Sequence, residues 1–130
     1  MSKVELELPA RATSPRAARQ AVSGLLRDEG ISGVAYDDAL LIVSELVTNA
    51  VRHARSDIEL VATFDRGELC VRVSDNESAI PRTAAPKPGQ AGGWGMFLVA
   101  EMCSEWGCEL HTSANGKTVW ATLPIGIPLD

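Results

Sequence analysis

Glu45 and Asn49 stand four residues apart in the segment DDALLIVSELVTNAVRHA, which contains neither glycine nor proline. If this segment is helical, the two side chains share one face, because residues four apart are neighbours on a helix surface. An asparagine amide oxygen suits Mg²⁺, which prefers oxygen ligands, and a carboxylate one turn away can accept a proton from an attacking hydroxyl or orient a water. The pair is therefore a candidate for phosphoryl transfer, with Asn49 as metal ligand and Glu45 as general base.

A solvated helix face is the alternative explanation for this polar sector, which also contains Arg52 and His53. Two observations favour a site. Leu41 and Ile42 are predicted to project toward the same sector one turn earlier, as the lining of a pocket would. Asn49 is also a mediocre helix former, tolerated best in a helix interior when its side chain has a specific partner.

Two glycines, Gly93 and Gly95, lie where a long loop meets the next helical segment. A helix N-terminus offers unpaired N–H groups and a positive dipole end to anions, and glycine lets the backbone approach a phosphate closely. An ordinary helix-start turn would explain a lone G-x-G motif equally well. The position between a lid-like loop and a helix gives the phosphate-binding interpretation the same weight as this alternative.

Asp75 ends the apolar strand-like run LCVRVS. Its carboxylate is therefore expected at an edge of the sheet, where it could accept a hydrogen bond from an adenine amino group. A capping or turn aspartate is the alternative.

The elements that must position these residues can be predicted from hydrophobic periodicity and turn signals. We expect strands or helices in the order β-α-α-β-β-α-β-β, which predicts an α/β two-layer sandwich with a mixed, largely antiparallel sheet and three helices on one face. The predicted segments are a strand at 4–8, a helix at 14–28 with Ser14 as N-cap, a helix from Asp37 or Asp38 to about Ala54, strands at 58–64 and 68–75 joined by Asp65-Arg66-Gly67, a helix from Gly95 ended by Gly107, and a closing hairpin around Ala114-Asn115-Gly116.

The second predicted helix should pack on the sheet through one broad apolar arc. Its members recur at helical spacing: Leu40, Val43, Leu46, Val47, Ala50, Val51 and Ala54. Between the fifth and sixth elements, the segment 76–93 is rich in proline and glycine and lacks sustained periodicity. A connection of this length inside a compact domain is usually a lid or a binding loop.

The composition bounds the class of protein. A chain of 130 residues with 45% hydrophobic content is the size of one domain with one core. No run approaches the roughly 20 apolar residues of a membrane span, and the N-terminus has no secretory apolar segment, so we expect a cytoplasmic protein without membrane association. A net charge of −5 disfavours nucleic-acid binding.

Three cysteines, Cys70, Cys103 and Cys108, form no C-x-x-C pair, so neither a disulfide framework nor a structural zinc site is expected. Arginines cluster in the first part of the chain and are most simply a solvated helix face, with a protein-binding surface as the alternative. They are Arg11, Arg16, Arg19 and Arg27.

Taken together, the segments ELVTNAVRHA, VSDNE, GGWGMFLV and GKTVWATLP resemble, in this order, the N-box, the two glycine boxes and the closing hairpin of the GHKL ATPase superfamily. Within that superfamily the chain is most similar to the bacterial anti-sigma-factor serine/threonine kinases. The resemblance covers nearly the whole chain. It implies a Bergerat fold, that is, a single histidine-kinase-like ATPase domain over residues 1–130 with an ATP lid at about 76–94.

The resemblance also implies roles for individual residues toward ATP and Mg²⁺. Glu45 matches the catalytic base and Asn49 the magnesium ligand. Asp75 matches the adenine ligand, and Thr118 matches the threonine that supports the adenine contact. Gly93 and Gly95 match the glycines of the phosphate lid.

The implied function is an ATP-binding anti-sigma factor that is also a serine/threonine protein kinase, with a sigma factor and a small anti-sigma-factor antagonist as partners and with homodimer formation expected. The alternative is a nucleotide-dependent protein-binding module of the same fold without phosphotransfer. Glu45 favours the kinase. The altered lid, which has Ala91 and Gly92 where some of these kinases carry an arginine just before the G-x-G, favours the binding module. Glu77 also stands where the superfamily often has glycine, and it adds a carboxylate near the anionic nucleotide.

Overall fold

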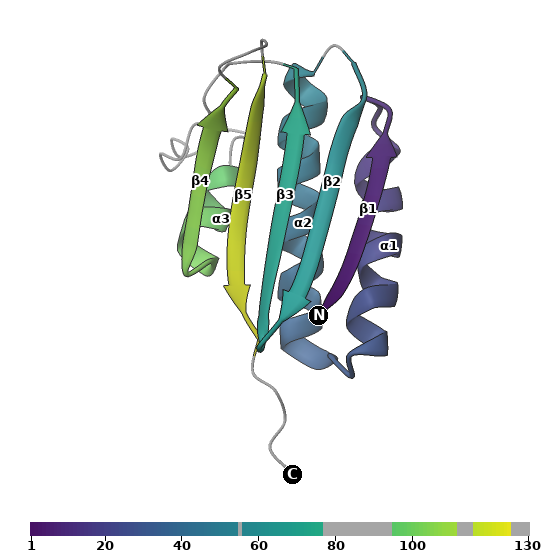
Figure 1. The fold of residues 1–130 in the computed structure, drawn as a ribbon, viewed down its shortest axis with the longest axis vertical. Helices are drawn as coiled ribbons and strands as arrows, with labels where there is room; N and C mark the ends of the chain where they lie inside the picture. The colour runs from purple at the N-terminus through teal and green to yellow at the C-terminus, as the bar shows by residue number, and fades with distance from the viewer. Residues whose placement is uncertain (55, 77–94, 112–115, 126–130) are drawn as a thin grey trace, which may run out of the picture.

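The computed structural model describes residues 1–54, 56–76, 95–111 and 116–125, which form a five-stranded sheet with helices covering one of its faces (Figure 1). The strand order is β1-β2-β3-β5-β4, and all four pairings are antiparallel. The predicted α/β two-layer sandwich is confirmed. The elements are β1 (Ser2–Leu8), α1 (Ser14–Asp28), α2 (Gly33–His53), β2 (Ile58–Asp65), β3 (Glu68–Asp75), α3 (Gly95–Met102), β4 (Glu105–Leu110) and β5 (Lys117–Pro124).

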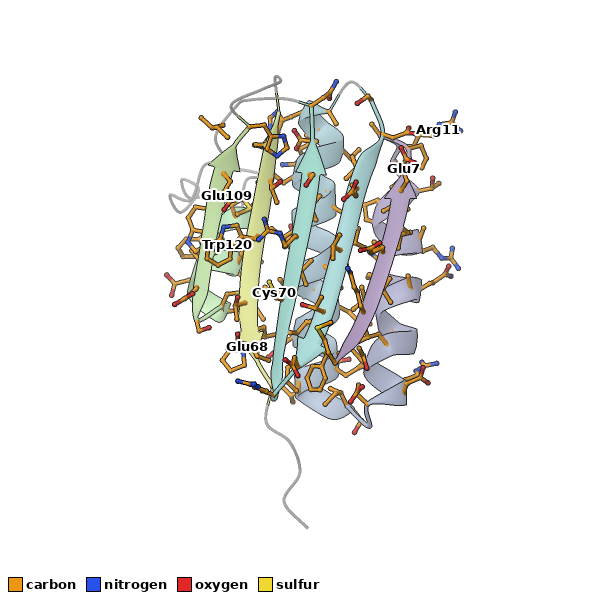
Figure 2. All side chains as sticks on the ribbon, viewed as in Figure 1. Glu7, Arg11, Glu68, Cys70, Glu109 and Trp120 are labelled. Carbon is orange, nitrogen blue, oxygen red and sulfur yellow. The ribbon has the colours of Figure 1, made fainter. Side chains whose placement is uncertain are left out.

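The sheet forms because its strands alternate apolar and polar residues, so that one face of each strand can be buried. On β3 the buried residues Leu69, Val71 and Val73 face the helices, and Cys70 and Arg72 between them face the other side. Figure 2 is drawn from that helix-free side. The register carries the same alternation across neighbouring strands, which joins the inward side chains into one core with α1 and α2.

Helix α1 has the bounds that the sequence predicts, but its N-cap is Thr13 rather than Ser14. The Ser14 side chain is buried, and its hydroxyl donates a hydrogen bond to the Pro9 carbonyl. Gly30 follows the helix with φ 75°, a conformation that glycine adopts without the steric cost other residues pay.

Helix α2 begins at Gly33, before the predicted start at Asp37 or Asp38. The reason lies in its first turn, where Tyr36 packs against α1. The Tyr36 hydroxyl lies 2.5 Å from Ser23 Oγ, and the Arg27 guanidinium lies over its ring, 5.7 Å from the centroid. The N-cap is Ser32, a residue type preferred at this position, although its side chain makes no capping hydrogen bond. The contacts of Tyr36 with α1 therefore stabilise this first turn.

The β2–β3 hairpin closes at Arg66 and Gly67, as the sequence predicts. Both residues have positive φ, 53° and 76° respectively. Two central residues with positive φ are the mark of a type I′ turn, whose twist matches that of the flanking antiparallel strands.

Helix α3 is shorter than predicted, and Gly107 does not terminate it. Gly107 lies instead within β4, opposite Trp120 of β5. A Cβ on Gly107 would come within 2.8 Å of the Trp120 ring, so the absence of a side chain makes room for the indole on the helix-free face. The glycine that looks like a helix stop is therefore a packing requirement of the β4–β5 pair.

Within the part of the chain that the structure describes, none of the helices combines the length and the apolar character that a bilayer crossing requires.

Candidate functional site

The polar sector of α2 is real, and its two candidate residues are both half-buried. Glu45 and Asn49 lie at one border of the buried arc of α2, which includes Val43 and Leu46. One expectation was wrong: Ile42 is 1% exposed and belongs to the core, because it stacks one turn before Leu46. Of the predicted apolar patch, only the half-exposed Leu41 remains outside the core.

The first residue of α3 lies directly against Glu45. A Cβ built on Gly95 would be 3.4 Å from Glu45 Cδ and in still closer contact with Oε2. Any side chain at position 95 would therefore press on the carboxylate. The structure thus brings the predicted base and one predicted phosphate-binding glycine together, whereas Gly93 lies outside the described residues.

Asp75, the predicted adenine ligand, ends β3 with a buried side chain that is paired with a lysine. The Lys117 Nζ lies 3.1 Å from Asp75 Oδ1 and 3.1 Å from Oδ2. Both side chains are 0% exposed. The two residues are also direct partners in the β3–β5 register, which fixes their side chains on the same face of the sheet.

Thr118 does not join this group. It pairs with Ser74, and its Oγ1 lies 2.8 Å from Ser74 Oγ and 2.9 Å from His111 Nε2. Because side chains alternate across a strand, the residue after Lys117 points to the opposite face from Asp75. The threonine expected beside the aspartate is thus on the helix-free face, and Lys117 occupies the place assigned to it.

Lys117 is the site residue that sequence reasoning missed, although a signal for it exists. In KTVWATLP the residues that pack into the core are Val119, Ala121 and Leu123. The same period of two extended backward puts Lys117, and not Thr118, on the inward face. A lysine at an inward position beside a buried aspartate predicts an ion pair.

The glycine before this lysine permits a close approach of two backbones. A Cβ on Gly116 would lie 2.6 Å from the Asp75 carbonyl oxygen. The His111 N–H donates to the Gly116 carbonyl at 3.0 Å, which ties the end of β4 to the start of β5. The Asp75–Lys117 pair therefore sits in a tightly constrained corner of the sheet.

Two of the three cysteines have raised pKa values and are poor nucleophiles at neutral pH. Burial raises the pKa of Cys103 to about 11. Burial also raises the pKa of Cys108, where the Lys117 ammonium acts in the lowering direction and the Asp75 carboxylate in the raising direction. No group of three or more His, Cys, Asp or Glu side chains within the described ranges is arranged to hold a metal ion.

The residues present fit a nucleotide with its metal. A carboxylate and an ammonium lie at the junction of β3 and β5, and Figure 1 shows that the C-terminal end of α2 lies at the same end of the molecule. Asn49 supplies a hard oxygen donor, and the side-chain-free backbone at Gly95 opens α3 toward Glu45. Residues of suitable chemistry are thus present for the general base, for the metal ion and for the phosphates.

Comparison with known proteins shows similarity to histidine kinase-like ATPase domains. The family profile described as "Histidine kinase-like ATPase domain" matches residues 8–123. A serine-protein kinase RsbW from Listeria innocua serovar 6a is 30% identical over 120 residues, which is 79% of this chain and 76% of the relative. A serine-protein kinase RsbW from Oceanobacillus iheyensis is 28% identical over 123 residues, covering 78% of this chain and 75% of the relative.

A solved structure also has the same fold. The crystal structure of the RsbU and RsbW domains of a Mycobacterium tuberculosis protein aligns with a TM-score of 0.74 and 22% sequence identity, covering 98% of this chain and 34% of that one. At this identity the match speaks for the fold alone.

Proposed function

The chain belongs to the histidine kinase-like ATPase domain family and, within it, to the RsbW-like serine-protein kinases, and from this premise we propose that it is an anti-sigma factor that phosphorylates a small antagonist protein on serine or threonine with Mg-ATP. One observation supports the kinase activity: Glu45, which lies one helical turn before Asn49 on α2, contacts Gly95, the first residue of α3. The sigma factor and the antagonist are taken from the family resemblance. Both partners belong to transcription control, which places the proposed activity in the cytoplasm.

In this proposal the adenine base of ATP binds at the β3–β5 junction. Asp75 is buried and ends its strand, so its carboxylate can accept from the adenine 6-amino group without competition from bulk water. The phosphates then extend toward the N-terminus of α3, where the helix dipole and the glycine backbone favour anions.

Asn49 would hold the metal through its amide oxygen, and bound Mg²⁺ would supply neutralisation of the phosphate charge. Asn49 is half-buried on α2, so part of the residue remains accessible to a ligand.

Glu45 would act on the incoming hydroxyl. As the serine or threonine oxygen forms its bond to the transferred phosphorus, and the bond to the bridging oxygen of ADP breaks, the hydroxyl proton passes to the Glu45 carboxylate. Its carboxylate lies against Gly95 at the start of α3, the helix proposed to bind the phosphates, which supports this role. The position is suited to a base that must reach both protein substrate and nucleotide.

The decisive experiment is Glu45→Gln, which keeps the shape of the side chain and removes the base. General-base contributions are typically about 10²–10⁴-fold, so phosphotransfer from labelled ATP to candidate antagonist proteins should fall by that order. ATP affinity measured by calorimetry should stay close to that of the parent. Glu101→Gln, the same chemical change at an exposed position of α3, is the matched control and should transfer phosphate at the parent rate.

Two outcomes would contradict the proposal. Equal transfer by the parent and Glu45→Gln would remove Glu45 as the base and leave positioning and the metal as the main catalytic contributions. A parent that binds ATP and a sigma factor but transfers phosphate to none of the antagonists would support the nucleotide-dependent binding module instead.

A further inference from the structure

Lys117 is a fully buried lysine whose charge the proposed mechanism does not use. Lysine is almost never fully buried unless it is paired, and here the partner is the equally buried Asp75. A buried ion pair is often no more stabilising than apolar residues of the same volume, because both charges must be desolvated. Stability alone therefore gives no reason for a lysine at this position.

The position of Lys117 points to the nucleotide base. Its ammonium lies at equal distances from the two oxygens of the carboxylate proposed to accept from adenine, so the corner presents one acceptor and one cationic donor side by side. The adenine edge has the complementary order, with a 6-amino donor next to the N1 acceptor. An ammonium has three N–H donors, so a bond to the carboxylate and a bond to a ring nitrogen are compatible.

We propose that Lys117 is a second base-reading residue, which donates to adenine N1 while Asp75 accepts from the 6-amino group. This inference rests on the proposed ATP site and adds a specificity-determining contact to it. Because both side chains are fully covered in this structure, base binding requires a rearrangement of the atoms above them. The β3–β5 register makes the two residues direct partners on one face of the sheet, which fixes the order of the acceptor and the donor.

The test compares ATP with two analogues by calorimetry on the parent protein. In 1-deaza-ATP, carbon replaces N1 and removes the acceptor that Lys117 would use. In purine riboside triphosphate, hydrogen replaces the 6-amino group that Asp75 would use. Loss of a hydrogen bond to a charged group should weaken 1-deaza-ATP roughly ten- to hundredfold relative to ATP.

Lys117→Met supplies the second arm, because it keeps the length of the apolar stem and removes the donor. This variant should bind ATP more weakly than the parent and should no longer distinguish ATP from 1-deaza-ATP. Thr122→Val, a near-isosteric change on the outer face of the same strand, should keep the parent's discrimination. If Lys117→Met does not fold, the comparison of nucleotides on the parent still decides the question.

The outcomes separate this inference from the function beneath it. Equal affinity of the parent for ATP and 1-deaza-ATP, with weaker binding of purine riboside triphosphate, would overturn the role of Lys117 and keep the ATP site at Asp75. A parent that binds none of the three nucleotides would overturn the proposed function itself.

Discussion

Asn49 shows how a single side chain in a helix interior can mark a site. It is half-buried in α2, where alanine would be the better helix former. An amide at such a position costs some helix stability, and a metal ion is a partner that would offset this cost. The role assigned to Asn49 therefore predicts opposite effects on stability and on binding when it is replaced.

Asn49→Ala should weaken Mg-ATP binding by roughly tenfold or more, because a metal ligand is lost, while thermal stability is unchanged or slightly higher. Calorimetry with and without Mg²⁺ measures the first effect, and a thermal melt measures the second. Asp37→Ala, at an exposed position near the start of the same helix, is the control and should bind like the parent. Parent-like Mg-ATP affinity in Asn49→Ala would rule out the metal assignment.

The site residues differ in how far the sequence can reveal them. Glu45, Asn49 and Asp75 can be predicted because each is a polar residue at a position set by local periodicity. The partner of Asp75 depends on which strand pairs with β3 and in what register, which is a long-range property. The sequence therefore predicts the aspartate and, through strand periodicity, can place Lys117 on the inward face, while the pairing of the two residues becomes evident only in the folded sheet.

At the scale of elements, local signals succeed where they act alone. The β2–β3 turn follows from turn chemistry, and the bounds of α1 follow from the proline in its first turn and from Gly30 after its end, although its N-cap is Thr13 rather than Ser14. The first turn of α2, which follows the N-cap Ser32, also has tertiary contacts of Tyr36 with α1. Beyond the end of α3, Gly107 lies in β4 against Trp120 and does not end the helix. Elements whose ends are set by distant neighbours are the ones that periodicity misplaces.

The β4–β5 pair predicts a sharp contrast between two glycines. In Gly107→Ala the new methyl group would press on the Trp120 ring, which should destabilise the fold by about 1–3 kcal/mol. In Gly24→Ala, on α1, the added Cβ meets nothing within 4 Å, so the variant should gain about 0.5–1 kcal/mol from helix propensity. Urea unfolding of both variants and of the parent checks the contrast. If Gly107→Ala unfolded at the same urea concentration as the parent, Trp120 would move aside at little cost.

At the scale of the whole molecule, the helix-free face of the sheet is strongly acidic. Figure 2 shows Glu109 beside Trp120 on this face, with Cys70 on the neighbouring strand β3. Two basic side chains on it, Lys3 and Arg72, are each ion-paired with a glutamate. Exposed acidic residues whose register positions place them on this face include Glu5, Glu7, Glu59, Asp65, Glu68, Glu105 and Glu109. Two copies meeting through this face would bring like charges together, which opposes a homodimer of that geometry.

Global stability should fall at alkaline pH through Cys103. Its folded-state pKa of about 11 lies above the ordinary value of 9.0, so the thiol ionises less readily in the folded protein than in the unfolded chain. The stabilising contribution is complete below pH 9 and is lost as the pH rises through 11, with a size of about 1–2 kcal/mol because solvent screens this half-buried thiol. Urea unfolding of the parent and of Cys103→Ala at increasing pH should show their difference shrinking, and a constant difference would contradict the shift.

In the proposed contact, the order of acceptor and donor in the buried pair at the junction of β3 and β5 determines which purine base fits, and this order can be reversed by mutation. Asp75 faces the exocyclic position of the purine and Lys117 the neighbouring ring nitrogen in the proposed contact, an order that complements adenine. Guanine presents the opposite order, an O6 acceptor next to an N1–H donor. Exchanging the two residues, as Asp75→Lys together with Lys117→Asp, preserves the buried charge balance and reverses the order of donor and acceptor. The same corner of the sheet would then be complementary to GTP. In the proposed contact, the preference for ATP or GTP is therefore a property of two paired residues rather than of the fold.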